Sequence, residues 1–254
     1  MALKRAIIIA SFGNRGDYVD SLWKNIRAYD KNIKIVVISD KANVITGLED
    51  YIHYILPDSD FKWRDSKRWG VRNCNLWLAK AALWEEYDSV CCLNDDMRIV
   101  HKGFLDGFAL AEKFGVCVPT NPRIYVKYNA MGADSTNEDR KETDKGPIYG
   151  PACNMSPMFV CRLHDHAKQL IEAYIEELHS CMRGTLAFWL ASYRTAVTPL
   201  YLPEQWCVCE SNAKYFRDYK KVLQGRTYPI EPIMLHWGQA GVREAFKGVY
   251  DGVD

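Results

Sequence analysis

Several patterns that would assign a function directly are missing from this sequence. The formal net charge is only +1, so no overall field favours nucleic acid or a membrane surface, and any basic site has to be local. No apolar run approaches the roughly 20 residues of a membrane-spanning helix. No G-x-G-x-x-G motif is present, which argues against a dinucleotide site of the usual kind.

The cysteines fit neither of their usual structural uses. There are nine, and none belongs to a C-x-x-C pair of the kind that binds zinc. Cys91 and Cys92 are adjacent within an apolar run, and Cys207 and Cys209 flank a single residue, unlike a spaced disulfide framework. The apolar run near the N-terminus ends in a turn and polar sequence, which predicts a strand and not a signal peptide. We therefore expect reduced, mostly buried thiols in a cytoplasmic protein.

The order of apolar segments predicts the fold class. Continuous β-branched runs at 5–11 and 33–39 are typical of parallel strands buried on both faces, and an amphipathic helix at 18–30 lies between them. This is a βαβ unit with a right-handed crossover. Further strands are predicted at 51–56, 89–93, 116–119, 154–161 and within 196–208, and helices at 68–86, 103–115, 165–182 and 184–195. The polar stretch 120–152 predicts a long mobile loop.

Polar residues follow three of the predicted strands. They are Ser11, Phe12, Gly13, Asn14 and Arg15 after the first, Ser39 and Asp40 after the second, and Asn94, Asp95 and Asp96 after 89–93. In open α/β sheets ligands bind at the carboxyl ends of strands, so we expect these groups at one edge. In the first group, an aromatic ring beside a glycine and an arginine can stack on a base and hold a phosphate, although an ordinary βα turn has a similar composition.

The acidic triplet is the most specific signal. Two adjacent carboxylates beside a carboxamide repel each other unless a cation lies among them. Oxygen ligands suit Mg²⁺ or Mn²⁺, which bind through one or two carboxylates together with substrate phosphates. A ligand-free Asn-Asp turn is the alternative. The position directly after a buried strand favours the metal.

The pattern of apolar strand, acidic triplet and renewed apolar strand resembles the nucleotide-sugar glycosyltransferases of the A-type fold. In that family a D-x-D motif holds a divalent cation on the donor diphosphate. Here Asn94 replaces the first acid, and the last acid, the usual metal ligand, is Asp96. IIIASFGN is similar to the family's first strand, and LHWGQAG is similar to the late segment of glycogenin-like members, where a histidine completes the metal site. The second ligand would therefore be His236.

The resemblance implies one α/β domain over residues 1–254, with a Rossmann-like, mostly parallel sheet flanked by helices. Residues 1–100 would form the nucleotide-binding half and 101–254 the acceptor-binding half. A sugar would move from a nucleoside-diphosphate sugar, with UDP expected first, to a hydroxyl of a glycan, a protein or a modified DNA base. The donor would be bound by Ser11, Phe12, Gly13, Asn14, Arg15, Asp40, Arg68, Arg72, Asn94 and Asp95, and Mn²⁺ or Mg²⁺ by Asp96 and His236.

Catalysis has two candidates because the stereochemical outcome is open. Glu204, in the turn LPEQW, is a possible base for an inverting reaction, with acids in 120–152 such as Asp134 as competitors. Asn154 resembles the mid-chain asparagine of the family, as a retaining enzyme would use, although Pro157 stands where glycine is usual.

Basic and aromatic residues alternate in FKWRDSKRWGVRN (61–73). Arg68 and Arg72 lie one helical turn apart and share a face, which suits a diphosphate. The same composition suits a nucleic-acid backbone or a solvated helix face. Two other functions therefore stay open: a nucleotidyltransferase that makes an activated sugar, and a non-catalytic module that binds glycan or nucleic acid.

Overall fold

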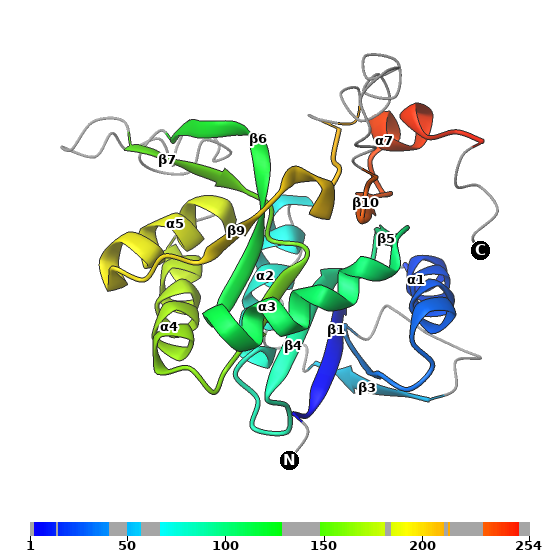
Figure 1. The fold of residues 1–254 in the computed structure, drawn as a ribbon, viewed down its shortest axis with the longest axis horizontal. Helices are drawn as coiled ribbons and strands as arrows, with labels where there is room; N and C mark the ends of the chain where they lie inside the picture. Colours follow the sequence, from blue (N-terminus) through cyan, green and yellow to red (C-terminus); the bar gives the residue numbers. More distant parts are fainter. Residues whose placement is uncertain are drawn as a thin grey trace.

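A mixed sheet runs through the centre of the molecule, with helices on both faces (Figure 1). The computed structural model describes residues 3–13, 15–40, 50–56, 67–128, 148–180, 184–210, 213 and 231–248. The strand order is β3-β2-β1-β4-β8-β6-β7, and β9 pairs with β6. The strands are β1 (Arg5–Ser11), β2 (Lys34–Ser39), β3 (Tyr51–Ile55), β4 (Ser89–Asn94), β6 (Val116–Tyr128), β7 (Ile148–Cys153), β8 (Met158–Cys161) and β9 (Leu200–Leu202). A separate two-stranded sheet pairs β5 (Met97–Ile99) with β10 (Met234–His236).

All the helices but the last divide between the two faces of the central sheet, and the last packs in a separate cluster with β10. The helices are α1 (Gly16–Tyr29), α2 (Lys67–Ala81), α3 (Asp106–Phe114), α4 (Asp165–Ser180), α5 (Gly184–Thr195) and α7 (Ala240–Ala245), with 3-10 turns η2 (Lys102–Leu105) and η4 (Glu204–Trp206). Along β1 the side chains alternate: Ile8 belongs to the core shared with α2, α4 and α5, whereas Ile7 and Ile9 belong to the core shared with α1 and α3. Both faces are therefore covered, which explains why β1 is apolar throughout.

The predicted α/β class is confirmed, and the structure adds where the parallel part lies. Strands β3, β2, β1 and β4 are parallel neighbours, whereas β8 lies antiparallel between β4 and β6. The third strand predicted at 51–56 is confirmed as β3. Helix α2 ends at Ala81 and not near residue 86.

The prediction of one long loop over 120–152 is wrong at its two ends. Strand β6 continues to Tyr128 and pairs antiparallel with β7 from Ile148 onward. The β-branched and aromatic residues in the sequence RIYVKY favour a strand. The many polar residues around them favour a loop, and the prediction followed these. The strand predicted from 154 begins only at Met158, after Pro157, which has no N–H to donate to a ladder.

Two features of this arrangement position the polar groups. In the parallel half, Ser11 is level with Ser39, and Ala10 is level with Asn94, so the polar residues that follow these strands meet at one edge. In the small sheet, His236 is level with Met97. The C-terminal segment is thereby placed beside the turn that joins β4 to β5.

Two expectations about the whole chain can be compared with the described part. Its cysteines are all free, and apart from Cys74 they are buried, as expected for reduced thiols. None of the described helices has the length and apolarity needed to cross a lipid bilayer.

Candidate functional site

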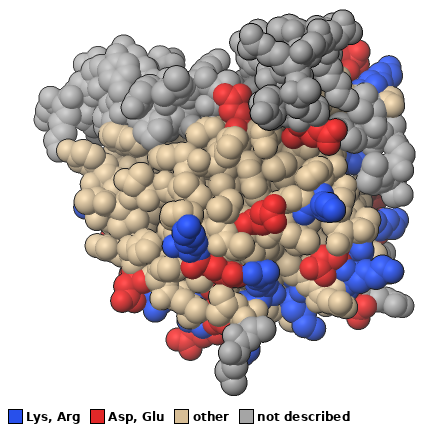
Figure 2. Space-filling view, in the orientation of Figure 1, with Lys and Arg blue, Asp and Glu red and all other residues tan. Residues whose placement is uncertain are grey.

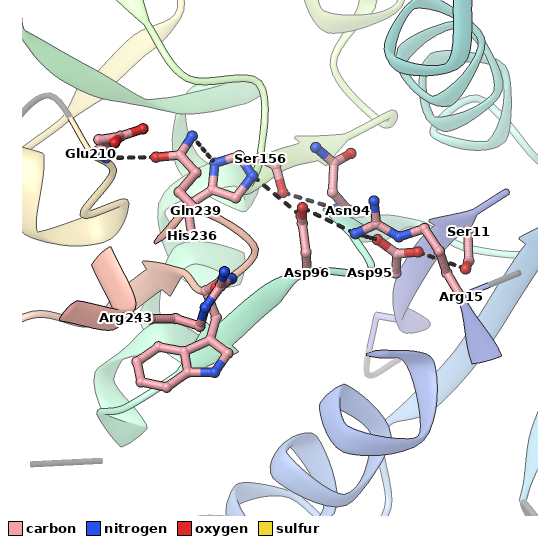
Figure 3. A network of polar contacts seen from close by, with 11 residues as sticks. Ser11, Arg15, Asn94, Asp95, Asp96, Ser156, Glu210, His236, Gln239 and Arg243 are labelled. Carbon is pink, nitrogen blue, oxygen red and sulfur yellow. Dashed lines mark hydrogen bonds and ion pairs between the residues drawn. The ribbon is translucent and has the colours of Figure 1, made fainter. Parts of the chain in front are cut away.

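The site is built around the acidic turn, by which we mean Asn94, the last residue of β4, together with Asp95 and Asp96, which join β4 to β5 (Figure 3). Asp95 is buried, with 5% of its surface exposed. Its Oδ2 accepts a hydrogen bond from Ser11 Oγ at 2.7 Å, and its Oδ1 lies 2.7 Å from Nη2 of Arg15. Both oxygens of this carboxylate therefore face groups that follow β1.

Arg15 connects the two carboxylates of the turn. The same Nη2 atom that contacts Asp95 lies 3.1 Å from Oδ2 of Asp96. The guanidinium also lies over the ring of Tyr18, 4.6 Å from its centroid, which is a cation–π distance. Arg15 precedes α1, so the βα turn predicted from the sequence does bring a basic group to the acidic turn.

His236 approaches Asp96 from the other side (Figure 3). Its Nε2 lies 3.2 Å from Oδ1 of Asp96. Its Nδ1 lies 3.1 Å from Nε2 of Gln239, and Oε1 of Gln239 accepts a hydrogen bond from the backbone N–H of Glu210 at 2.5 Å. The ring is therefore held at both nitrogens, one by the acidic turn and one by a glutamine that is itself anchored.

Burial and charge act differently on the two carboxylates. Burial raises the pKa of Asp95 to about 6, although the charge of Arg15 and the hydrogen bond from Ser11 act in the opposite direction. Burial also raises the pKa of Asp96, but contacts with His236 and Arg15 outweigh it, and the pKa of Asp96 is lowered. Asp96 is the carboxylate that stays ionised most readily.

The raised pKa of Asp95 predicts that the free energy of unfolding depends on pH. Between its ordinary pKa of 3.8 and about 6, the folded protein keeps a proton that the unfolded chain has released. This contribution is present at low pH and is lost as the pH rises through 6, by up to roughly 3 kcal/mol. Urea unfolding at pH 4.5 and 7 should show that the stability of wild type relative to Asp95→Asn falls on going to pH 7. A relative stability that is constant or rises would contradict the burial argument.

The residues around Asp96 fit a divalent cation. Oδ1 of Asn94 is buried and has no hydrogen-bond partner among the described residues, and Oδ1 of Asp96, also buried, faces Nε2 of His236. Ligands at right angles around Mg²⁺, each about 2.1 Å from the ion, lie about 3 Å apart, and the observed Asp96–His236 separation is 3.2 Å. Within the described ranges no group of three or more His, Cys, Asp or Glu side chains is gathered at one point. A site made of one carboxylate and one imidazole would leave the remaining positions of a divalent ion to substrate phosphates and water.

The other residues predicted to bind the donor either lie near the same edge of the sheet or fall outside the described residues. Both carboxylate oxygens of Asp40 lie 3.2 Å from the backbone N–H of Gly13, which joins the ends of β1 and β2. Phe12 is 6% exposed and packs in the core on the α2 face, so its role with a base stays a prediction. Asn14, Asp134 and residues 61–66 lie outside the described residues, as do the side chains of Arg68 and Arg72, although both positions belong to α2.

The two residues predicted for catalysis occupy different surroundings. Asn154 lies two residues before Ser156, whose Oγ accepts a hydrogen bond from the backbone N–H of Asn94 at 2.9 Å. Nδ2 of Asn154 is buried and has no hydrogen-bond partner within the described part of the chain. Glu204 begins η4, which follows β9, and is partly exposed. No contact found among the described residues joins its carboxylate to the acidic turn.

Sequence reasoning missed three residues of this site. Gln239 orients His236, Ser156 holds the backbone of Asn94, and Gly238 packs directly on Asp96. The backbone N–H of Gly238 donates to the carbonyl of Asp96 at 3.1 Å. The glutamine three residues after His236 was a usable signal, because ring nitrogens need an orienting partner; the other two contacts depend on the fold.

Comparison with solved structures shows which fold this is. The chain matches a crystal structure of the galactosyltransferase LgtC with donor and acceptor sugar analogues, with a TM-score of 0.54 at 14% identity over 91% of this chain and 86% of that one. It matches mouse xyloside xylosyltransferase 1 with a TM-score of 0.51 at 8% identity, over 91% and 97%. The chain has the A-type glycosyltransferase fold.

A third match covers a longer protein. The bifunctional glycosyltransferase WbbM gives a TM-score of 0.56 at 16% identity, over 93% of this chain but 46% of WbbM. No family model matches the sequence, and no curated protein matches it. At these identities the likeness describes the A-type fold of the chain, and its chemistry has to be argued from the site.

Proposed function

We propose that this chain is a metal-dependent glycosyltransferase that moves a sugar from a nucleoside-diphosphate sugar to an acceptor hydroxyl. The observation that carries the proposal is the convergence of Asp96 and His236 at the carboxyl end of β4, 3.2 Å apart. Ser11, Arg15 and Asp40 follow the two neighbouring strands at the same edge. This is the edge at which open α/β sheets bind their ligands.

Each group would have a distinct task toward the donor. Asp96 and His236 would hold Mn²⁺ or Mg²⁺, which when bound neutralises charge on the departing diphosphate. Arg15, together with Arg68 and Arg72 of α2, would supply further positive charge for the phosphates. The unpartnered Oδ1 of Asn94 and Nδ2 of Asn154 would bond to donor hydroxyls, since buried polar atoms rarely stay unpaired.

The acceptor would bind in the second half of the chain. We propose residues 101–254 as the acceptor-binding half, with Glu204 as base if the reaction inverts and Asn154 close to the reacting carbon if it retains. The acceptor is a glycan or protein hydroxyl in the first instance. On the face shown in Figure 2, basic and acidic side chains of the described residues are interspersed, so this face gives no support to a DNA acceptor.

The proposal is tested by thermal unfolding with UDP, GDP, CDP or dTDP and their common sugars, each with Mn²⁺ or with a chelator. A ligand that binds the native state raises its melting temperature by mass action. We expect one nucleotide to raise it only with Mn²⁺, and the matching nucleotide sugar to be consumed. Pyrophosphate release from a nucleoside triphosphate and a sugar phosphate would instead identify a nucleotidyltransferase. No shift with any nucleotide would contradict the proposal.

Gln239 gives a second test of the metal site. Replacing Gln239 by alanine removes the partner that holds Nδ1 of His236, without touching Asp96. Loss of such an orienting group lowers metal affinity or activity about 10- to 100-fold, and we expect Mn²⁺ titration to show a change of this size. The control is Gln205→Ala, in the neighbouring η4 turn, which should bind Mn²⁺ as wild type does. Unchanged Mn²⁺ affinity in Gln239→Ala would mean that His236 is not a ligand.

A further inference from the structure

The positively charged guanidinium of Arg15 already lies against the acidic turn. Arg15 Nη2 is 2.7 Å from Oδ1 of Asp95 and 3.1 Å from Oδ2 of Asp96, with the guanidinium supported by the ring of Tyr18. The side chain of Arg15 is nevertheless 38% exposed, whereas those of Asp95 and Asp96 are 6% and 16% exposed. The arginine therefore reaches the buried carboxylates from the solvent side.

In this arrangement Arg15 occupies one of the two carboxylate oxygens of Asp96. Arg15 lies on Oδ2, and Oδ1 remains facing His236. A divalent ion at Oδ1 would meet one carboxylate oxygen in place of two, close to a fixed positive charge. Both effects weaken binding, because affinity for such ions depends on the number and charge of the ligands.

We propose that Arg15 is the resident counter-ion of the acidic turn, which keeps metal affinity low until the diphosphate of a donor arrives. A diphosphate offers the guanidinium a paired acceptor of the geometry that arginine prefers. Transfer of Arg15 to the phosphates frees Oδ2 of Asp96, and the metal and the diphosphate then bind together. This rests on the proposed function and adds a coupling between the two ligands, with Arg15 as the residue that sets it.

The test is Mn²⁺ binding, measured from the free-ion signal in electron paramagnetic resonance, with and without UDP. In Arg15→Gln we expect Mn²⁺ alone to bind about tenfold tighter than in wild type. We also expect the increase in Mn²⁺ affinity caused by UDP to be smaller than in wild type. Arg15→Lys, which keeps the charge but cannot bridge both carboxylates equally well, should lie between them.

The matched control is Lys24→Gln, on helix α1, which Arg15 directly precedes. Lys24 forms an exposed ion pair with Asp20, so this change removes the same charge away from the acidic turn. It should bind Mn²⁺ as wild type does, and tighter binding in this variant would reduce the Arg15 effect to net charge and overturn the proposal. Equal or weaker Mn²⁺ binding by Arg15→Gln and Arg15→Lys would also overturn it.

The two proposals fail separately. Tighter Mn²⁺ binding by Arg15→Gln in a protein that consumes no nucleotide sugar would support the counter-ion role and contradict the transferase. Consumption of a nucleotide sugar with no change in Mn²⁺ affinity in Arg15→Gln would support the transferase and contradict the counter-ion role. If the nucleotide bound is not UDP, the same titration is made with the one found by thermal unfolding.

Discussion

Replacing Asp96 by alanine is expected to remove metal-dependent donor binding and to lower kcat/KM by at least about a hundredfold. Asp96 is the carboxylate whose pKa is lowered by its surroundings, and its Oδ1 is the buried oxygen that faces Nε2 of His236 at 3.2 Å. Its loss removes a proposed metal ligand and leaves Arg15 paired with Asp95 alone. The measurements are consumption of the nucleotide sugar and the Mn²⁺-dependent rise in melting temperature, both of which should disappear.

A comparison with Asp20→Ala separates this effect from a general loss of charge. Asp20 is paired on the surface of α1 with Lys24, and exposed pairs contribute little to stability. That variant should keep full activity and the full Mn²⁺-dependent shift. Full Mn²⁺-dependent activity in Asp96→Ala would show that the metal is held elsewhere.

The second large effect is expected from Gly238→Ala, which deletes no polar group. A Cβ at this position would lie 2.3 Å from Oδ2 of Asp96 and 2.7 Å from its Cβ and Cγ. The backbone φ of Gly238 is not in the left-handed region, so the change acts through this contact. Either Asp96 or the backbone at residue 238 has to shift, which disturbs the contacts of Asp96 with Arg15 and His236, and we expect the loss of Mn²⁺ binding to approach that of Asp96→Ala.

Gly241→Ala is the matched control for that experiment, three residues along the same segment. The three atoms nearest to its added Cβ all belong to the side chain of Glu210, which is exposed and can turn aside. We expect Mn²⁺ affinity close to that of wild type. If Gly238→Ala also bound Mn²⁺ normally, the position of Asp96 would not matter for the ion, and the proposed site would be wrong.

The parts of this molecule that follow from local sequence were predictable. The buried strands β1, β2 and β4 are continuous apolar runs. The rule that ligands bind at the carboxyl ends of strands predicts from the sequence alone that Arg15 and the acidic turn lie at one edge of the sheet. The ion pairs between Arg15 and the two aspartates agree with that expectation. These predictions succeed because burial on both faces and parallel pairing leave few alternatives.

Contacts made by distant segments were not predictable in the same way. His236 was chosen only from a resemblance, because its approach to Asp96 depends on the pairing of β10 with β5. Gly238 carries no signal in the sequence, since its importance lies in the atoms packed against it. The β6–β7 pairing was missed for a similar reason: its polar surroundings resemble a loop until the partner strand is known.

The pairing of β5 with β10 has a consequence for the order in which the protein becomes competent during synthesis. The acidic turn and Arg15 leave the ribosome before His236, because they precede it in the chain, and together they can form the ion pairs seen here. His236 belongs to a segment made much later, and that segment has to add itself to β5, which is already present. A nascent chain can therefore build the parallel half of the sheet while Arg15 is the positively charged group paired with the acidic turn. The proposed ligand pair of Asp96 and His236 therefore comes together only after β10 has paired with β5.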